Sequence, residues 1–448
     1  MLGELTRTRA VEDWARVAAR WHLRAQNVLA LSSLAGVAFL CAIVLTKTFF
    51  LGSDSANNYA HVWYIYDRIF HHAELPLQMA PLESGRALTF PYAVVPWLLT
   101  VVPYAVLGDR AVTLAMVAGF VLYGYAAARA RPALRDPRLL SLIYVNTFLI
   151  ESLVSFQMAF VWACAFFFLF VEAVDRRWFA LAAVLAVCAV TSHPFAGAPA
   201  VGLYAAYAAA RRPRDITRLA VAMLVALIVL VPFALYIHSA PAVASTRSQD
   251  LAGTLRFMLR YRGLVVVLPL IVSAFAPAFR TLFIVAFLAM ALTFVQRIEA
   301  KKVNTFGIDR NSHTFYGEFL RSPHFDPRMR YRVLEPNDRE DGAYQLIRGG
   351  AVLAQEFFDQ SQFRRWWNSP EQYACFLGAK RVDVVLLERD YHWKFNQNED
   401  ARLREFEANG VAHVVYQDER PDRKGPRFWA YDVRAARRDG VTLADCGL

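Results

Sequence analysis

Two carboxylates near the ends of apolar segments could take part in proton transfer. Asp54 lies a few residues beyond the apolar run 28–45, and Glu151 directly follows the run 139–150. A positioned carboxylate can take a proton from an attacking hydroxyl and accelerate a reaction about 10²- to 10⁴-fold. We therefore consider Asp54 a candidate general base and Glu151 a candidate second acid. Alternatives stay open, because Asp54 could cap the helix that follows it and Glu151 could be an interfacial carboxylate.

Six further polar residues between the apolar runs could bind a substrate beside these carboxylates. They are His61, Gln157, His193, Arg247, Arg256 and Arg260. The three arginines belong to the segment 239–262 and could bind an anionic group of the substrate. The same segment could instead form a basic amphipathic helix on anionic headgroups. The histidines match no metal-ligand spacing, so we assign no metal ligand.

The elements that would position these residues are long apolar segments. Hydrophobic residues make up 56% of the 448-residue chain and charged residues 19%, and the apolar runs fall between residues 28 and 296. About 18 to 20 apolar residues span a bilayer. Nine segments approach or reach that length: 28–45, 111–128, 139–150, 159–174, 179–190, 196–210, 219–237, 264–276 and 282–295. Residues 1–300 therefore predict a polytopic α-helical membrane protein of the plasma membrane, with about nine transmembrane helices in contact with membrane lipids.

Arginines occur in some connecting segments and not in others. They cluster in 129–138, 176–177 and 211–218, whereas 151–157 and 192–195 contain no Lys or Arg. Since cytoplasmic loops of membrane proteins are enriched in Lys and Arg, the N-terminus is predicted to be cytoplasmic. The proline-containing segment 90–107 then does not cross, residues 46–110 form a long first external loop, and the C-terminal part is extracytoplasmic. This distribution also accounts for the net charge of +11 without a nucleic-acid partner.

From about residue 301 the composition becomes that of a soluble domain. Short apolar runs bounded by charges predict strands at 382–387 and 411–416. Helical spacing covers 370–377 and 400–408, and Ser369-Pro370 is typical of a helix start. Residues 301–448 are therefore predicted to form a small C-terminal α/β soluble domain. Its cysteines, Cys375 and Cys446, could pair if the domain faces an oxidising compartment.

The order of residues after the first apolar run resembles a known family. The pattern is Asp54, His61, Ile69, Leu75-Pro76, Gly85, Phe90-Pro91-Tyr92 and an apolar stretch that ends at Leu107-Gly108. It resembles the first external loop of the glycosyltransferase C superfamily, which comprises multispanning enzymes that use polyprenyl-phosphate-linked sugars. The pair His193-Pro194 is similar to bacterial members, and the stretch 352–386 resembles the C-terminal domain of actinobacterial members.

This resemblance implies a reaction. Asp54 would be the base that activates a hydroxyl of an extracytoplasmic acceptor, which could be a glycan, a lipid or a protein. The donor would be a sugar linked to polyprenyl phosphate, and the phosphate would leave with inversion at the anomeric carbon. Some members use a divalent cation, Mg or Mn, and others use none, so no certain cofactor is implied.

Two other functions are compatible with the sequence. A carrier or flippase for lipid-linked sugars needs polar residues at mid-membrane depth, whereas the middles of the apolar runs here are almost wholly apolar. A catalytically inactive scaffold that binds glycan is also compatible, because the matching motifs are short and tolerate loss of activity.

Overall fold

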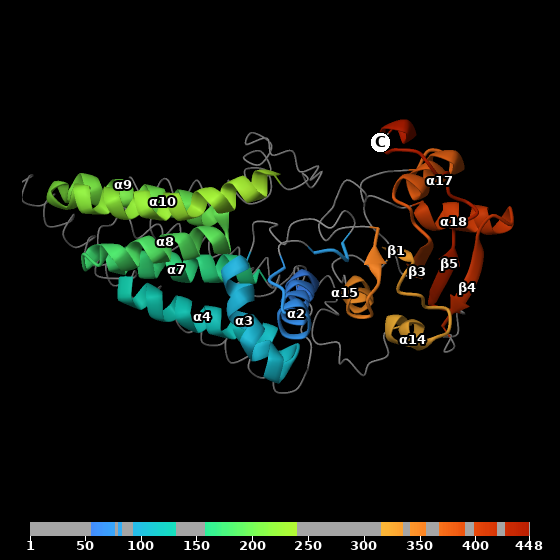
Figure 1. The fold of residues 1–448 in the computed structure, drawn as a ribbon, viewed down its shortest axis with the longest axis horizontal. Helices are drawn as coiled ribbons and strands as arrows, with labels where there is room; N and C mark the ends of the chain where they lie inside the picture. The colour runs from blue at the N-terminus through green and yellow to red at the C-terminus, as the bar shows by residue number, and fades with distance from the viewer. Residues whose placement is uncertain are drawn as a thin grey trace, which may run out of the picture.

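The computed structural model describes residues 55–76, 79–82, 93–130, 157–239, 315–334, 341–354, 367–389, 398–418 and 426–447. Within these ranges a bundle of long helices lies beside a smaller α/β domain (Figure 1). Helices α2 (Ser55–His72) and α3 (Val94–Leu107) lie between the two.

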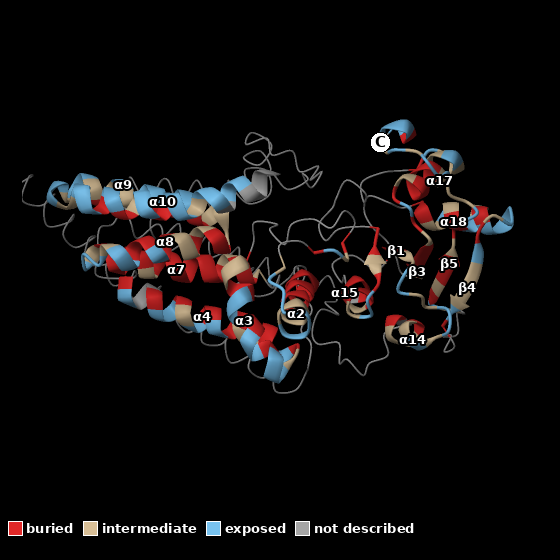
Figure 2. Ribbon diagram, viewed as in Figure 1, coloured by how far each residue is buried: buried red, intermediate tan, exposed pale blue. Residues whose placement is uncertain are grey.

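The bundle is built around one apolar helix, α7 (Met158–Asp175). It packs against α4 (Arg110–Ala130), α8 (Phe179–Ser192) and α9 (Pro194–Arg211). Most of its Phe, Val and Ala side chains are buried, as the buried colour along α7 shows (Figure 2). α9 is followed by the short η2 (Pro213–Asp215) and by α10 (Ile216–Ser239), which packs against α8.

Local sequence signals explain where these helices begin and approach one another. Pro194 occupies the first turn of α9, where its missing N–H costs nothing, and the His193 side chain accepts the backbone N–H of Ala196 as an N-cap. α8 and α9 come close at Gly197, where an added Cβ would lie 2.4 Å from the Ala189 carbonyl oxygen. A side chain at that position would therefore push the two helices apart.

The C-terminal domain contains a five-stranded mixed sheet in the order β2-β1-β3-β5-β4. Its strands are β1 (Arg330–Leu334), β2 (Val352–Leu353), β3 (Val384–Glu388), β4 (His413–Gln417) and β5 (Phe428–Asp432). β1 is parallel to both β2 and β3, whereas β5 is antiparallel to both β3 and β4. Every residue of β3 is buried, as expected for a strand near the middle of a covered sheet.

Helices α14 (Phe315–Arg321), α15 (Asp341–Arg348), α17 (Pro370–Ala379) and α18 (Glu399–Ala408), together with the short η5 (Ala444–Cys446), surround the sheet (Figure 1). The helices and strands predicted for this part of the chain are present, with ends that differ by one or two residues. Inside the domain, Arg332 of β1 and Glu399 of α18 form an ion pair with both side chains fully buried. The Tyr373 hydroxyl also donates to Glu399, at 2.8 Å, so the buried charges are paired and hydrogen-bonded as burial requires.

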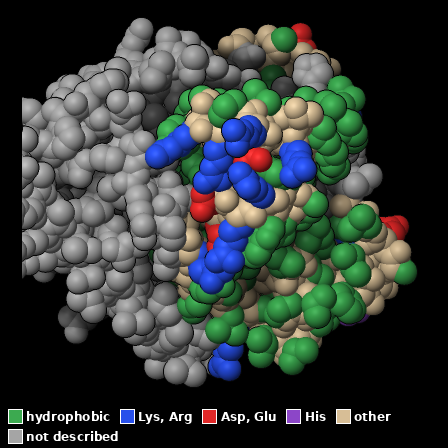
Figure 3. All heavy atoms as spheres, turned by 90° about the vertical axis from the view of Figure 1, so that its left-hand side faces the viewer, with side chains coloured by type: hydrophobic (Ala, Val, Ile, Leu, Met, Phe, Trp, Pro, Cys, Tyr) green, Lys and Arg blue, Asp and Glu red, His purple; other side chains and the backbone are tan. Residues whose placement is uncertain are grey.

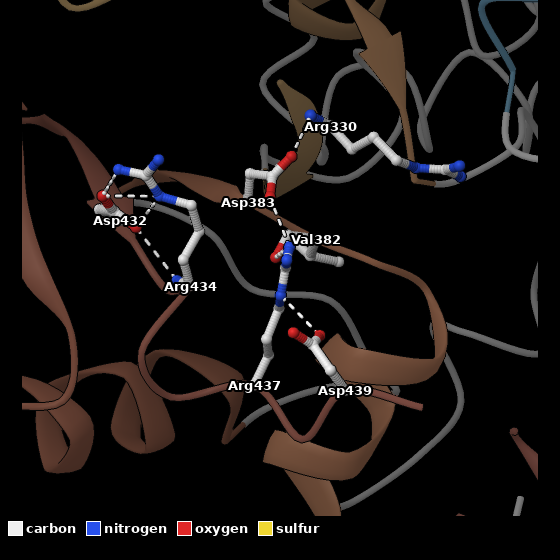
Figure 4. A network of polar contacts seen from close by, with 7 residues as sticks. All are labelled: Arg330, Val382, Asp383, Asp432, Arg434, Arg437 and Asp439. Carbon is white, nitrogen blue, oxygen red and sulfur yellow. Dashed lines mark hydrogen bonds and ion pairs between the residues drawn. The ribbon is translucent and has the colours of Figure 1, made fainter. Parts of the chain in front are cut away.

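Ion pairs and a disulfide connect the segment after β5 to the sheet and to α17. Arg437 forms an ion pair with Asp383 at the start of β3, and its Nε lies 2.8 Å from Asp439 (Figure 4). The other oxygen of Asp383 accepts the backbone N–H of Arg330 at 2.9 Å. A disulfide between Cys375 of α17 and Cys446 of η5 closes the C-terminal end of the chain onto the domain.

The prediction of about nine transmembrane helices is wrong. In the described part of the chain, two helical segments are long and apolar enough to cross a membrane, namely α7 and the segment Pro213–Pro232 that includes most of α10. The apolar segments Val94–Leu107, Arg110–Ala126 and Phe179–Ser192 are shorter. At 14 residues, α3 is about 21 Å long, below the ~30 Å of a hydrocarbon layer.

The error has a physical cause, because an apolar run is typical of a buried core helix as well as of a helix that faces lipid. α7 is 72% buried inside the protein over its apolar window, whereas the corresponding window of α10 is only 17% buried. The hydropathy of the sequence therefore does not distinguish a helix buried in the protein from one that is exposed on its surface. The predicted spans 28–45, 139–150, 264–276 and 282–295 lie outside the described residues.

Candidate functional site

Three of the eight predicted site residues lie in the described part of the chain. They are His61, Gln157 and His193. The others, Asp54, Glu151, Arg247, Arg256 and Arg260, lie outside the described residues. The described residues nearest in sequence to the predicted base Asp54 are those of α2, which begins at Ser55.

The first turns of α2 carry buried polar side chains. Ser55, directly after Asp54 in the sequence, begins α2 and is completely buried. Asn57, Asn58 and His61 follow and are also buried. Burying polar groups is costly unless they are hydrogen-bonded, so this row indicates a segment held in place by specific partners.

His61 is held between its own helix and α3. Its Nδ1 lies 2.8 Å from the carbonyl oxygen of Asn57, and its ring stacks on Trp97 with centroids 4.1 Å apart. Because a carbonyl only accepts, Nδ1 carries the proton and Nε2 is the acceptor of the neutral ring. Burial lowers the pKa of His61 from 6.5 to about 4, so the ring is neutral at pH 7.

The start of α3 connects α2 with the turn between α8 and α9. The Trp97 indole N–H donates to the Asn58 side-chain oxygen at 2.9 Å, which fixes α3 against α2. Four residues earlier, the backbone N–H of Ala93 donates to the Ser192 carbonyl at 2.7 Å. Ser192 is the last residue of α8, and it immediately precedes His193.

His193 and Gln157 meet at the same end of the bundle. The ring of His193 lies edge-on to Phe160, with centroids 5.7 Å apart. Gln157 caps the start of α7, where its carbonyl accepts the backbone N–H of Phe160 at 3.1 Å. Burial also lowers the pKa of His193 to about 4. The structure thus places His61 against α3, and it places Gln157 and His193 beside Phe160 at the start of α7.

These positions limit the chemistry that the residues can perform. Both histidines are neutral at pH 7 and can donate or accept hydrogen bonds, but they cannot balance the charge of a departing phosphate. Moreover, only 4% of the surface of His61 is exposed. His61 therefore suits the role of a positioning residue that fixes α2, rather than the direct substrate contact predicted from its place in the sequence.

The structure also shows a charged cluster that the sequence reasoning missed. Asp109, between α3 and α4, is buried and accepts the hydroxyls of Tyr104 and Tyr344, at 2.7 and 2.5 Å. Arg348 lies 3.0 Å from its second oxygen. Because Tyr344 and Arg348 belong to α15, this carboxylate joins the helical bundle to the C-terminal domain. An acidic residue between apolar runs was the available signal, since such a residue usually has a partner.

The C-terminal domain covers α2 from the side opposite to α3. The rings of Tyr59 and Tyr344 lie 5.8 Å apart, which brings α15 against α2. Beyond α2, the Pro81 carbonyl accepts the backbone N–H of Leu353, and Leu82 pairs with Leu353 alongside β2. The helix that follows Asp54 is therefore enclosed by the bundle and by the α/β domain.

A metal site is not assembled within the described ranges, where no group of three or more His, Cys, Asp or Glu side chains could hold an ion. Asp67, which contacts His71 and His72 near the end of α2, is a smaller and solvent-exposed group. Comparison with protein-family models gave no match, and comparison with curated proteins gave no relative.

Proposed function

We propose that the chain is a membrane glycosyltransferase. It transfers a sugar from a polyprenyl-phosphate-linked donor to an acceptor hydroxyl, with Asp54 as the general base. One observation carries the proposal: Ser55, the residue after Asp54, is completely buried on the same helix as the buried His61, whose ring stacks on Trp97 of α3. A catalytic carboxylate must be held by rigid neighbours to be effective, and the start of α2 has such neighbours.

The reaction would proceed by a single displacement. Asp54 takes the proton from the acceptor hydroxyl as its oxygen attacks the anomeric carbon of the sugar. The bond between this carbon and the phosphate oxygen breaks, and polyprenyl phosphate leaves with the electron pair. The neutral His61 and its partner Trp97 keep α2 in place throughout, because neither changes charge during the step.

A membrane location is supported by α10. Its 24 residues extend about 36 Å, enough for a ~30 Å hydrocarbon layer. Only 17% of its apolar window is buried, and the exposed colour runs along most of the helix (Figure 2). Soluble proteins rarely expose contiguous apolar surface of this extent, so we propose that α10 contacts lipid.

The orientation of the chain in the membrane is supported by chemistry at opposite ends of the molecule. Arginines lie at the ends of α4, α7 and α9 and at the start of α10. These helix ends are far from the α/β domain (Figure 1), and cytoplasmic ends are rich in arginine. The α/β domain contains the disulfide Cys375–Cys446, which persists in oxidising compartments. We therefore propose that the arginine-rich end is cytoplasmic and the C-terminal domain extracytoplasmic.

The test compares two carboxylate variants of the full chain reconstituted in lipid nanodiscs. The probes are polyprenyl-phosphate-linked sugars with cell-envelope glycan as acceptor, and the readout is released polyprenyl phosphate. Asp54→Asn is expected to abolish release, with unchanged folding by circular dichroism. Asp67→Asn changes a partly exposed carboxylate of the same helix; it is the matched control and should keep normal release. Normal turnover by Asp54→Asn would refute the proposal, and a wild-type chain that binds the donors without turnover would favour the inactive scaffold.

A further inference from the structure

One end of the helical bundle forms a cationic surface. Its arginines come from the ends of α4, α7 and α9 and from the start of α10: Arg129, Arg176, Arg177, Arg211, Arg212, Arg214 and Arg218. We call these seven residues the arginine face. Figure 3 views the molecule from this end and shows blue side chains gathered around a few red carboxylates, next to green apolar surface.

Carboxylates at this end pair with part of the arginine face. Glu172 contacts both Arg129 and Arg176, at 2.7 and 3.0 Å. Asp175 pairs with Arg212, and Asp215 lies 3.0 Å from Arg177. These contacts hold the ends of α4, α7 and α9 together. At this end of the bundle, among the described residues, the seven arginines thus face three carboxylates, which leaves a net charge of four positive units.

The excess is concentrated between α9 and α10. Arg211, Arg214 and Arg218 fall within eight residues of one another and are all exposed to solvent. Asp215 is the one carboxylate among them in the sequence, and it is engaged by Arg177. Three guanidinium groups on one connection present a site for an anion with several oxygens, since arginine binds phosphate oxygens with paired N–H groups.

Aromatic rings accompany the arginines from three different helix ends. The guanidinium carbon of Arg176 lies 5.0 Å from the ring of Trp178, and those of Arg129 and Arg211 lie 5.8 Å from the rings of Tyr125 and Tyr207. Trp178 and Tyr125 are about half exposed. Trp and Tyr are typical of the headgroup layer of a membrane, where the ring is apolar and its edge is polar.

An exposed apolar band begins immediately beyond these residues. It consists of α10 side chains that lie toward the α/β domain from Arg218: Val221, Leu224, Val225, Leu227, Ile228, Val229, Val231 and Leu235. Each is between 44% and 62% exposed. Along one helix, phosphate-binding cations are thus followed directly by a surface that suits acyl chains.

We propose that the arginine face binds the phosphate of an anionic phospholipid headgroup. Arg211, Arg214 and Arg218 would contact the phosphate oxygens, and the ring of Tyr207 would lie beside the headgroup. The contiguous apolar band favours a phospholipid over free phosphate, because only the lipid has acyl chains to cover that band. This inference rests on the proposed membrane location of the chain and is independent of the transferase chemistry.

The experiment measures thermal unfolding of the detergent-solubilised full chain as phospholipid is added. Phosphatidylglycerol is expected to raise the midpoint of unfolding at lower concentration than phosphatidylcholine does. In the triple variant Arg211→Gln/Arg214→Gln/Arg218→Gln, the phosphatidylglycerol concentration that gives half of the effect should increase about 10- to 100-fold, because each basic residue near an anionic headgroup contributes appreciably. Inorganic phosphate should give no comparable shift.

A charge-matched control removes three exposed arginines from the C-terminal domain, in the variant Arg321→Gln/Arg404→Gln/Arg438→Gln. This variant should respond to phosphatidylglycerol as the wild type does. Equal responses of both triple variants, or equal effects of the two phospholipids on the wild type, would overturn the inference. If the first variant does not fold, the salt dependence of the wild type serves as the test. The phosphatidylglycerol concentration that gives half of the effect must increase by about an order of magnitude or more as salt rises from 50 to 500 mM.

Discussion

The hydroxyl of Tyr344 offers a direct test of how the C-terminal domain is held against the bundle. The buried Asp109 carboxylate accepts hydrogen bonds from Tyr104, Tyr344 and Arg348, of which the last two come from α15. Tyr344→Phe removes one of these three donors without changing the ring that packs against Tyr59. The variant therefore removes the hydroxyl that joins α15 to Asp109 and that also lies 3.3 Å from the Tyr104 hydroxyl.

The expected cost follows from the charge and burial of the acceptor. A hydrogen bond to a charged group contributes about 1.5–3 kcal/mol, and the other two donors still satisfy the carboxylate, so we expect about 2 kcal/mol. Since about 1.4 kcal/mol corresponds to a factor of ten, local opening of α15 should become about 30-fold more frequent. Amide hydrogen exchange, followed by mass spectrometry, should accelerate by that factor over Asp341–Arg348. Exchange in Val384–Glu388 should stay unchanged, because β3 is buried away from the junction.

The matched control for this measurement is Tyr66→Phe. Tyr66 belongs to the same aromatic group, with its ring centroid 5.2 Å from that of Tyr104, but the contact is made by the ring, which Phe keeps. Exchange in α15 should therefore resemble that of the wild type. Equal acceleration in both variants, or none in Tyr344→Phe, would show that the Asp109 cluster does not hold the domain.

Two further predictions concern stability. Because burial lowers the pKa of His61 from 6.5 to about 4, the unfolded state binds a proton first as pH falls, and the free energy of unfolding decreases by about 3 kcal/mol between pH 6.5 and 4. His61→Gln should flatten that part of a plot of thermal stability against pH. A plot identical to that of the wild type would contradict this expectation. Cys446→Ser opens a disulfide that joins residues 71 apart and should destabilise the C-terminal domain by up to about 4 kcal/mol. Wild type in dithiothreitol should match that variant by urea unfolding, and a midpoint at the oxidised wild-type value would contradict the expectation.

Local elements of the C-terminal domain could be predicted because their signals are local. The helix at Pro370–Ala379 begins where Ser369 caps it, with the Ser369 hydroxyl 3.2 Å from the Gln372 backbone nitrogen. β3 follows from a continuous apolar run. The number of membrane-spanning helices could not be predicted in this way, because burial in the bundle and exposure to lipid select the same residue types.

The contacts of the candidate site join residues that are far apart in the sequence. The grouping of His61, Gln157 and His193 stays a prediction. In the structure His61 stacks on Trp97, whereas His193 and Gln157 both contact Phe160. The stack of His61 on Trp97 joins residues 36 apart in sequence, and the hydrogen bond from Tyr344 to Asp109 joins residues 235 apart. Such partners depend on how helices pack, and no spacing in a single sequence specifies them.

The neutral histidines lead to a prediction about how a lipid phosphate would be bound. A phosphate monoester gains its second negative charge near pH 6, so binding to arginines should strengthen as pH rises from 5 to 7. Binding to protonated histidines would instead weaken over the same range. Since burial lowers the pKa of both His61 and His193 to about 4, the arginine behaviour is expected for polyprenyl phosphate, with Arg256 as a candidate ligand. Titration of the full chain with polyprenyl phosphate should show affinity that increases with pH in the wild type, and a smaller affinity with the same direction in Arg256→Gln. Affinity that falls from pH 5 to 7 would mean that a group protonated at low pH supplies the charge, and the assignment of the phosphate to arginines would be refuted.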